Sequence, residues 1–269
     1  MKHFLFILCA LCCMTSCKNG AKREMVTSDT KTNETEAIEK INYPKTLDSV
    51  FDAHGGVSLW KQYRTMTFTI PKDENPETHI TDLYSRKDRI VTPNYNMGFD
   101  GQRPWLLNKE QAYAGNVEFY HNLMFYFYAM PFVLADDGIH YKEAEPLQYD
   151  GISYPGIQIT YGEGIGASPK DEYYLHYHPE TYQMTWLGYT VTYRTGEDSD
   201  NIKWIRYDDW GNFNGLILPN SISWYDYEGM NIKALRNTVK FEQVALAKNK
   251  KPEGFYDKPD RAQYYVKPE

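Results

Sequence analysis

Cysteine is absent from most of this chain. All four cysteines (Cys9, Cys12, Cys13 and Cys17) lie within the first 17 of its 269 residues. The rest can form no internal disulfide, so its hydrophobic core must hold the fold without cross-links. Long apolar runs are missing too: the run from Phe4 to Met14 is shorter than the roughly 20 residues that a membrane-spanning helix needs, and no later run approaches that length.

Positive charge is scarce. The chain has 29 Lys and Arg against 36 Asp and Glu, a formal net charge of −7. Nucleic acids and anionic membrane surfaces attract basic proteins, so this balance argues against nucleic acid as a partner. Aromatic residues, by contrast, are abundant at 16%, with 24 Tyr, 12 Phe and 6 Trp. Tyrosine suits half-buried strands and wet cavities, because its ring is buried while its hydroxyl finds a partner.

The N-terminus has the order of a cleaved signal peptide. A charged start, Met1-Lys2-His3, precedes a short apolar run and small residues. The segment Met14-Thr15-Ser16-Cys17 resembles the bacterial lipoprotein signal, in which the cysteine becomes acylated. This resemblance implies removal of residues 1–16, lipidation of Cys17 and a lipid anchor in the cell envelope, at the outer membrane facing the periplasm. The alternative is an ordinary secretory signal with incidental cysteines.

The remaining chain divides into a tether, a folded region and a tail. Residues 17–43 are polar after Cys17 and predict a flexible tether. Residues 44–247 form the predicted folded domain, and residues 248–269, polar with three prolines, predict a loose tail. Within the domain, Leu47, Val50 and Phe51 recur at helical spacing, and Gly55-Gly56 should end that helix.

Most of the domain has the alternating pattern of β-strands. Met66, Phe68 and Ile70 alternate with threonines, which predicts a strand with one buried face. Further strands are expected near 78–85, 88–92, 95–99, 104–108, 157–161, 172–178, 182–194, 202–208, 221–227 and 238–244, whereas 135–151 is turn-rich. The aromatic segment 117–133 lacks glycine and predicts a helix that covers an apolar face. The sum is a mainly β (α+β) fold of about ten antiparallel strands and two or three helices.

Two turn motifs carry a family resemblance. Phe99-Asp100-Gly101 leads to Trp105, and Tyr173-Tyr174-Leu175 leads to the turn Pro179-Glu180-Thr181. Both resemble turns of the outer-membrane lipoprotein carrier and receptor (LolA/LolB-like) superfamily. The segments 128–136 and 204–207 are also similar to an uncharacterised Bacteroidota-type lipoprotein family of that superfamily. The resemblance implies one unclosed, curved sheet, a half-barrel whose concave face is covered by helices around a cavity for acyl chains.

Eight large aromatic residues are the candidates for lining such a cavity, although they could equally form a solid core. They are Trp60, Trp105, Phe119, Phe127, Phe132, Trp186, Trp204 and Trp224. His176 and His178 lie two residues apart on one predicted strand and so share a face. They are weak metal-ligand candidates, because a zinc site needs further ligands that the sequence does not place.

The leading hypothesis is a non-enzymatic, lipid-anchored envelope protein that binds an apolar ligand, such as an acyl chain or the lipid of a lipoprotein. No cofactor is expected. One alternative is an envelope hydrolase acting on glycan or lipid, which would require carboxylates or His176 and His178 to converge in a cleft. The other is a protein-binding scaffold at the outer membrane, which would require a solid core and an exposed apolar patch.

Overall fold

The protein is built mainly from two seven-stranded antiparallel sheets. The computed structural model describes residues 43–162, 170–193 and 195–267. The chain divides into units 1–40 and 41–269, and every described residue belongs to the second. The first sheet holds β1 (Thr65–Ile70), β2 (Glu77–Asp82), β3 (Asp88–Val91), β4 (Tyr95–Phe99), β5 (Pro104–Asn108), β13 (Glu242–Ala247) and β14 (Gln263–Tyr264). The second holds β6 (Ile139–Tyr149), β7 (Ile152–Tyr161), β8 (Tyr173–Tyr177), β9 (Met184–Tyr189), β10 (Lys203–Phe213), β11 (Leu216–Glu228) and β12 (Asn231–Lys240).

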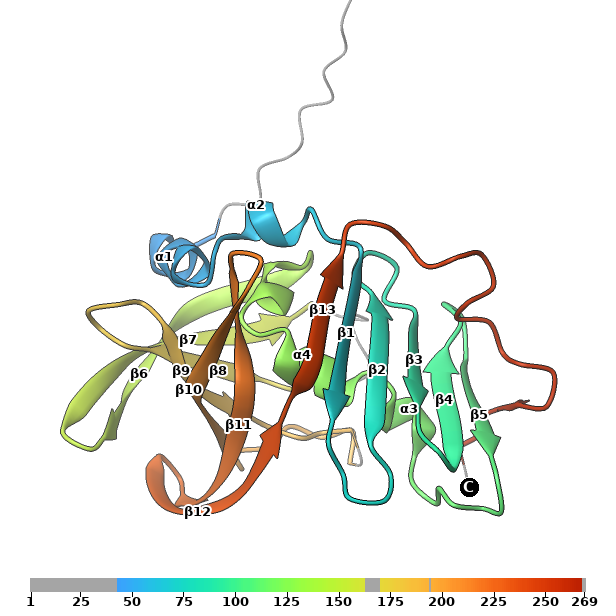
Figure 1. The fold of residues 1–269 in the computed structure, drawn as a ribbon. Coiled ribbons are helices and arrows are strands. Elements are labelled where there is room, and N and C mark those ends of the chain that lie inside the picture. Colours follow the sequence, from blue (N-terminus) through green and yellow to red (C-terminus); the bar gives the residue numbers. More distant parts are fainter. Residues whose placement is uncertain (1–42, 163–169, 194, 268–269) are drawn as a thin grey trace, which may run out of the picture. The chain divides into compact units, whose positions relative to one another are not determined.

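The predicted mainly β, antiparallel and unclosed architecture is confirmed, but the single half-barrel of about ten strands is not. The strand orders are β13-β1-β2-β3-β4-β5-β14 and β12-β11-β10-β9-β8-β7-β6 (Figure 1). Only Phe241 separates β12 from β13. Its buried ring packs on Phe68 and Tyr128, with centroids 5.4 and 4.5 Å away. The Phe241 N–H still donates to the Asn220 carbonyl of β11 at 2.8 Å, whereas Glu242 is already opposite Thr69 of β1, so the chain passes from one sheet to the other at this residue.

The first helix follows its sequence pattern. The helices are α1 (Lys45–Ala53), α2 (Val57–Trp60), α3 (Val117–Tyr120), α4 (Leu123–Tyr128) and the 3-10 helix η1 (Phe132–Ala135). α1 buries Leu47, Val50 and Phe51 and is followed by Gly55, whose φ is +100°. A Cβ at Gly55 would lie 2.3 Å from the carbonyl oxygen of Gly215, so glycine is required there. In the described part of the chain, no helix is long and apolar enough to cross a membrane.

The expected helix over 117–133 is instead three short segments. Asn122, between α3 and α4, has φ −112° and ψ −3°, and Pro131, which has no backbone N–H, precedes η1. The segments still cover an apolar face, as the pattern predicted. The Tyr128 ring lies 4.5 Å from that of Phe68 on β1. The Tyr207 hydroxyl on β10 donates to the Phe127 carbonyl at 2.8 Å, so α4 contacts both sheets.

Further segments differ from the sequence-based expectation. The strand expected over 238–244 is divided between the end of β12 and the start of β13, which belong to different sheets. The turn-rich stretch 135–151 contains β6, an edge strand that pairs with β7 and is mostly exposed, so it lacks an apolar alternation that would reveal it. The tail is packed rather than loose. The Trp105 indole N–H donates to the Tyr256 carbonyl at 3.0 Å, Tyr256 is buried, and β14 pairs with β5. One buried tyrosine in a polar, proline-containing segment is too weak a signal to predict this packing.

Candidate functional site

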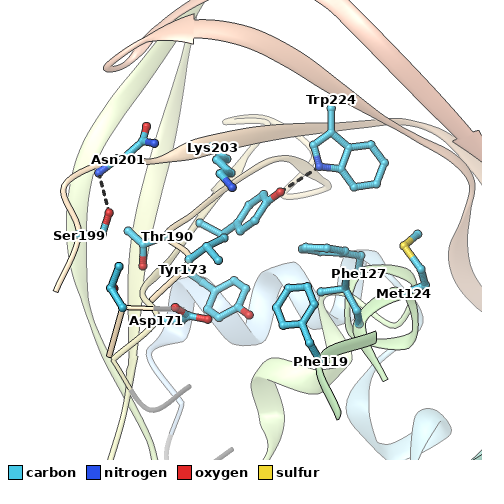
Figure 2. Close-up of a pocket in the computed structure, with 14 residues that line it drawn as sticks. Phe119, Met124, Phe127, Asp171, Tyr173, Thr190, Ser199, Asn201, Lys203 and Trp224 are labelled. Carbon is cyan, nitrogen blue, oxygen red and sulfur yellow. Dashed lines mark hydrogen bonds between the residues drawn. The ribbon is translucent and has the colours of Figure 1, made fainter. Parts of the chain in front are cut away.

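An apolar cavity of about 520 Å³ lies between the short helices and the second sheet (Figure 2). Four apolar side chains come from α3 and α4: Phe119, Leu123, Met124 and Phe127. The opposite wall consists of Asp171, Tyr173, Tyr189, Thr190, Val191, Thr195, Ser199, Asn201, Lys203 and Trp224. Ligand pockets generally occupy roughly 300–1,000 Å³ and combine an apolar lining with a few polar groups. The cavity therefore has the size and lining of a small-molecule site.

Strand register brings the sheet side of the cavity together. Tyr173 of β8 is opposite Tyr189 of β9, and Tyr189 is opposite Lys203 of β10. Cross-strand partners share a face, so three neighbouring strands present these side chains in a row. Trp224 of β11 pairs with Ile205, two residues along β10 from Lys203 and on the same face. The Trp224 indole N–H donates to the Tyr189 hydroxyl at 3.0 Å, which fixes both rings.

The helix side contributes aromatic rings that face this row (Figure 2). The Phe127 ring lies 5.1 Å from Tyr189 and 5.8 Å from Trp224, at distances typical of aromatic pairs. The Phe119 ring lies 5.1 Å from that of Tyr193. Burial raises the pKa of both the Tyr173 and Tyr189 phenols. These hydroxyls therefore stay protonated, and the aromatic wall carries no charge at neutral pH.

Two charged side chains stand at the cavity. The Asp171 carboxylate accepts hydrogen bonds from the Thr192 N–H at 2.6 Å and the Thr192 hydroxyl at 2.7 Å, so it organises the adjoining loop. Lys203 is half-buried, and its ammonium group forms no hydrogen bond or ion pair within the described residues. An apolar cavity with one unpaired cation can hold a hydrophobic or amphiphilic molecule.

The eight predicted aromatic residues fall into three groups. Phe119, Phe127 and Trp224 line this cavity together. Trp60 and Phe132 stack at 4.8 Å beside a different cavity of about 420 Å³. The other three, Trp105, Trp186 and Trp204, are almost fully buried and lie outside the 520 Å³ cavity. Cys17 lies outside the described residues.

Trp186 and Trp204 occupy the opposite face of the second sheet. They form a separate cluster with Leu147 and Tyr154. Alternation along the strand explains this, because Trp204 neighbours Lys203 and must point away from it. Trp204 also lines a smaller cavity of about 310 Å³ formed by residues of β9–β12. These tryptophans therefore belong chiefly to the core cluster on the face of the second sheet opposite the 520 Å³ cavity.

His176 and His178 do not form a metal site in the structure. His176 is buried with its Nδ1 atom 3.2 Å from the Tyr154 carbonyl, and burial lowers its pKa to about 4. His178 follows the end of β8, beyond a register shift between His176 and Tyr177. Among the residues that the structure describes, no three His, Cys, Asp or Glu side chains are grouped closely enough to hold a metal ion.

Several lining residues were not singled out from the sequence. Leu123 and Met124 lie in the apolar segment predicted to act as a cover, so their placement follows from that prediction. Tyr173 and Tyr189 lie in the two strands that flank the predicted Pro179-Glu180-Thr181 turn, but a register shift between His176 and Tyr177 is what brings them opposite each other, and the sequence does not reveal it. Lys203 had no such signal, because a lysine at the start of a strand is ordinarily solvated.

Comparisons with known proteins give distant structural similarities. No model of a known protein family matches the sequence, and no curated protein matches it either. A DUF1329 family protein from Desulfovibrio piger is 10% identical with a TM-score of 0.47, over 78% of this chain and 98% of the other. A LolA superfamily protein from Nitrosomonas europaea is 10% identical with a TM-score of 0.41, over 78% and 96%. A putative outer membrane lipoprotein-sorting protein domain from Vibrio parahaemolyticus is 6% identical with a TM-score of 0.38, over 76% and 97%. Similarities at this level do not by themselves establish function.

Proposed function

We propose that this protein is a lipid-anchored protein of the cell envelope that binds a hydrophobic ligand in the 520 Å³ cavity. The ligand class is an acyl chain, a lipid or the lipid portion of a lipoprotein. The observation that carries the proposal is the cavity lining: Phe119, Leu123, Met124 and Phe127 face an uncharged aromatic wall. Such a lining can bind apolar groups, and its charged groups do not form a catalytic constellation.

Burial of apolar surface would drive binding. Removing apolar area from water contributes about 25 cal/mol per Å², so each 100 Å² of chain buried adds about 2.5 kcal/mol before ordering costs. The Trp224–Tyr189 hydrogen bond and the packing of Phe127 on both rings hold part of the cavity wall in place. A preformed wall reduces the entropy lost on binding, which leaves more of the burial energy for affinity.

The proposed location rests on the N-terminal sequence. Acylation of Cys17 would place lipid chains at the mature N-terminus, and residues 17–43 could extend up to about 85 Å from the membrane. The residues that follow Cys17 contain no acidic cluster of the kind linked to surface export, which favours the periplasmic leaflet of the outer membrane. A protein that is itself anchored suits a receptor or resident binding protein better than a diffusing carrier.

Native mass spectrometry would test the proposal. The mature chain from residue 17, with Cys17→Ser to prevent acylation, retains every described residue and would be purified from a bacterial periplasm. We expect a co-purifying lipid at near one-to-one stoichiometry. Val191→Trp should fill the cavity and abolish the adduct, whereas Leu235→Trp, at a position 57% exposed on β12, should leave it unchanged. A protein that stays unliganded after incubation with phospholipid, fatty acid and acylated peptide would overturn the proposal.

A further inference from the structure

The smaller cavity adjoins the proposed acyl site. Its volume is about 310 Å³, and it is lined by Tyr189, Lys203, Trp204, Trp224, Tyr225, Tyr227, Arg236, Asn237 and Val239. Three of these residues, Tyr189, Lys203 and Trp224, also line the 520 Å³ cavity. The two cavities therefore share a boundary, and Lys203 stands on it.

The smaller cavity is positively charged although the protein as a whole is acidic. Lys203 and Arg236 line it, and the described residues of its lining include no Asp or Glu. Neither cation has an ion-pair or hydrogen-bond partner within the described chain, whereas Lys233, on the same strand as Arg236, pairs with Glu228 at 3.0 Å. Burial raises the pKa of the Tyr189 phenol, and the positive charge of Arg236 opposes that rise. The Arg236 charge therefore acts at the boundary that the two cavities share.

We propose that the bound molecule is an amphiphile with an anionic head group. This inference rests on the proposed function. The hydrocarbon part would occupy the cavity between α3–α4 and the second sheet, and the carboxylate or phosphate would lie at Lys203 and Arg236. The half-buried Lys203 ammonium has lost part of its hydration without gaining a partner, and an anion would offset that loss.

The chemistry predicts discrimination by head group. A hydrogen bond to a charged partner typically changes affinity by about tenfold or more. An anionic amphiphile should therefore bind about tenfold more tightly than a neutral amphiphile with the same chain. Part of this preference should disappear at high salt, because Arg236 is exposed and its field is screened.

Isothermal titration calorimetry with four amphiphiles of equal chain length would test the inference. Dodecanoate and dodecyl phosphate carry the two candidate anions, monododecanoyl glycerol is neutral, and dodecyltrimethylammonium is cationic; each is used below its micelle concentration. The protein is the mature chain with Cys17→Ser. It is compared with Lys203→Gln, with Lys203→Gln/Arg236→Gln, and with the control Lys240→Gln, an exposed β12 lysine outside both cavities.

We expect both anions to bind more tightly than the neutral compound, and the cation to bind most weakly. Lys203→Gln should reduce anion affinity about tenfold and change neutral affinity much less, the double variant should remove the preference, and Lys240→Gln should change neither affinity. The ratio of dodecanoate to dodecyl phosphate affinity would identify a fatty acid or a phosphate head group. Equal binding of anionic and neutral compounds in every variant would overturn this inference while supporting the apolar site. No binding of any compound would overturn the proposed function itself.

Discussion

Acid sensitivity of the fold should depend on His54, which follows the last residue of α1. The side chain is fully buried. Its Nε2 atom accepts a hydrogen bond from the Met184 N–H at 3.0 Å, and its Nδ1 atom lies 3.1 Å from the Ile217 carbonyl oxygen. This pair of contacts requires a neutral ring with its proton on Nδ1, because a protonated Nε2 could not accept. Burial lowers the pKa of His54 to about 4, against a minor opposing effect of the Ile217 carbonyl.

The size of the effect follows from proton linkage. An unfolded histidine has a pKa of about 6.5, so between pH 6.5 and 4 the unfolded chain binds a proton that folded His54 does not. Stability from this group is fully present above pH 6.5 and is lost as pH falls toward 4. At pH 5 the loss is about 2 kcal/mol. His176, whose pKa burial also lowers to about 4, should add a similar loss.

Urea unfolding at pH 8 and pH 5 would measure this loss for the wild type and for His54→Gln. Glutamine can both donate and accept, so the variant should lose about 1–2 kcal/mol at pH 8 from altered packing and geometry. Between pH 8 and pH 5, the free energy of unfolding of this variant should fall by about 2 kcal/mol less than that of the wild type. His140→Gln, at an exposed position on β6, is the matched control and should keep the wild-type difference. A His54→Gln variant that loses as much stability as the wild type would refute the reasoning.

Two further predictions concern a buried carboxylate and a close backbone contact. Burial alone would raise the pKa of Glu77, but the nearby His79 ring and hydrogen bonds from Lys72, Tyr95 and Tyr120 lower it to about 2. Tyr120→Phe should therefore raise the Glu77 pKa and cost about 1.5–3 kcal/mol near pH 7, as measured by carboxyl NMR titration and urea unfolding; an unchanged pKa would contradict the assignment. Gly55→Ala should destabilise more than Gly151→Ala in thermal unfolding, because both have positive φ but only Gly55 has a carbonyl oxygen 2.3 Å from the added Cβ. Equal losses would mean that φ alone matters.

Local sequence signals predicted the elements that depend on nearby residues. The strands at 95–99 and 104–108 are observed with those bounds. The Asp100-Gly101 turn between them forms as expected: the Asp100 carboxylate accepts hydrogen bonds from the Gln102 and Arg103 N–H groups at 2.8 and 2.9 Å. In each case the information lies within a few residues. Apolar residues at every second position indicate the strand, and a side-chain hydrogen-bond acceptor followed by glycine indicates the turn.

The division into two sheets and the grouping of the site depend on distant residues. The chain passes from one sheet to the other at Phe241, whose ring packs against Phe68, more than 170 positions earlier, and its local sequence gives no sign of this contact. Among the predicted aromatic residues, Trp224 lines the 520 Å³ cavity and Trp204 does not, because their side chains lie on opposite faces of the second sheet. The face on which Trp224 lies depends on its pairing with Ile205, which a single strand cannot reveal. Aromatic content thus predicted the kind of lining but not which residues form it.

The contacts around α3 and α4 constrain how the proposed ligand would reach the cavity. The Tyr120 hydroxyl donates to the Glu77 carboxylate at 2.7 Å, and the His121 ring pairs with Asp88, so the start of the cover is bound to the first sheet. The Tyr207 hydroxyl binds the Phe127 carbonyl and fixes the other end to the second sheet. Lifting the cover would break buried contacts to charged groups, each of which contributes about 1.5–3 kcal/mol. Entry of the proposed ligand along the boundary at Lys203 would break none of these contacts of α3 and α4. Its hydrocarbon chain would enter first, and its anionic head group would then lie at Lys203. The same residue would then govern both the route of entry and the selection of the ligand.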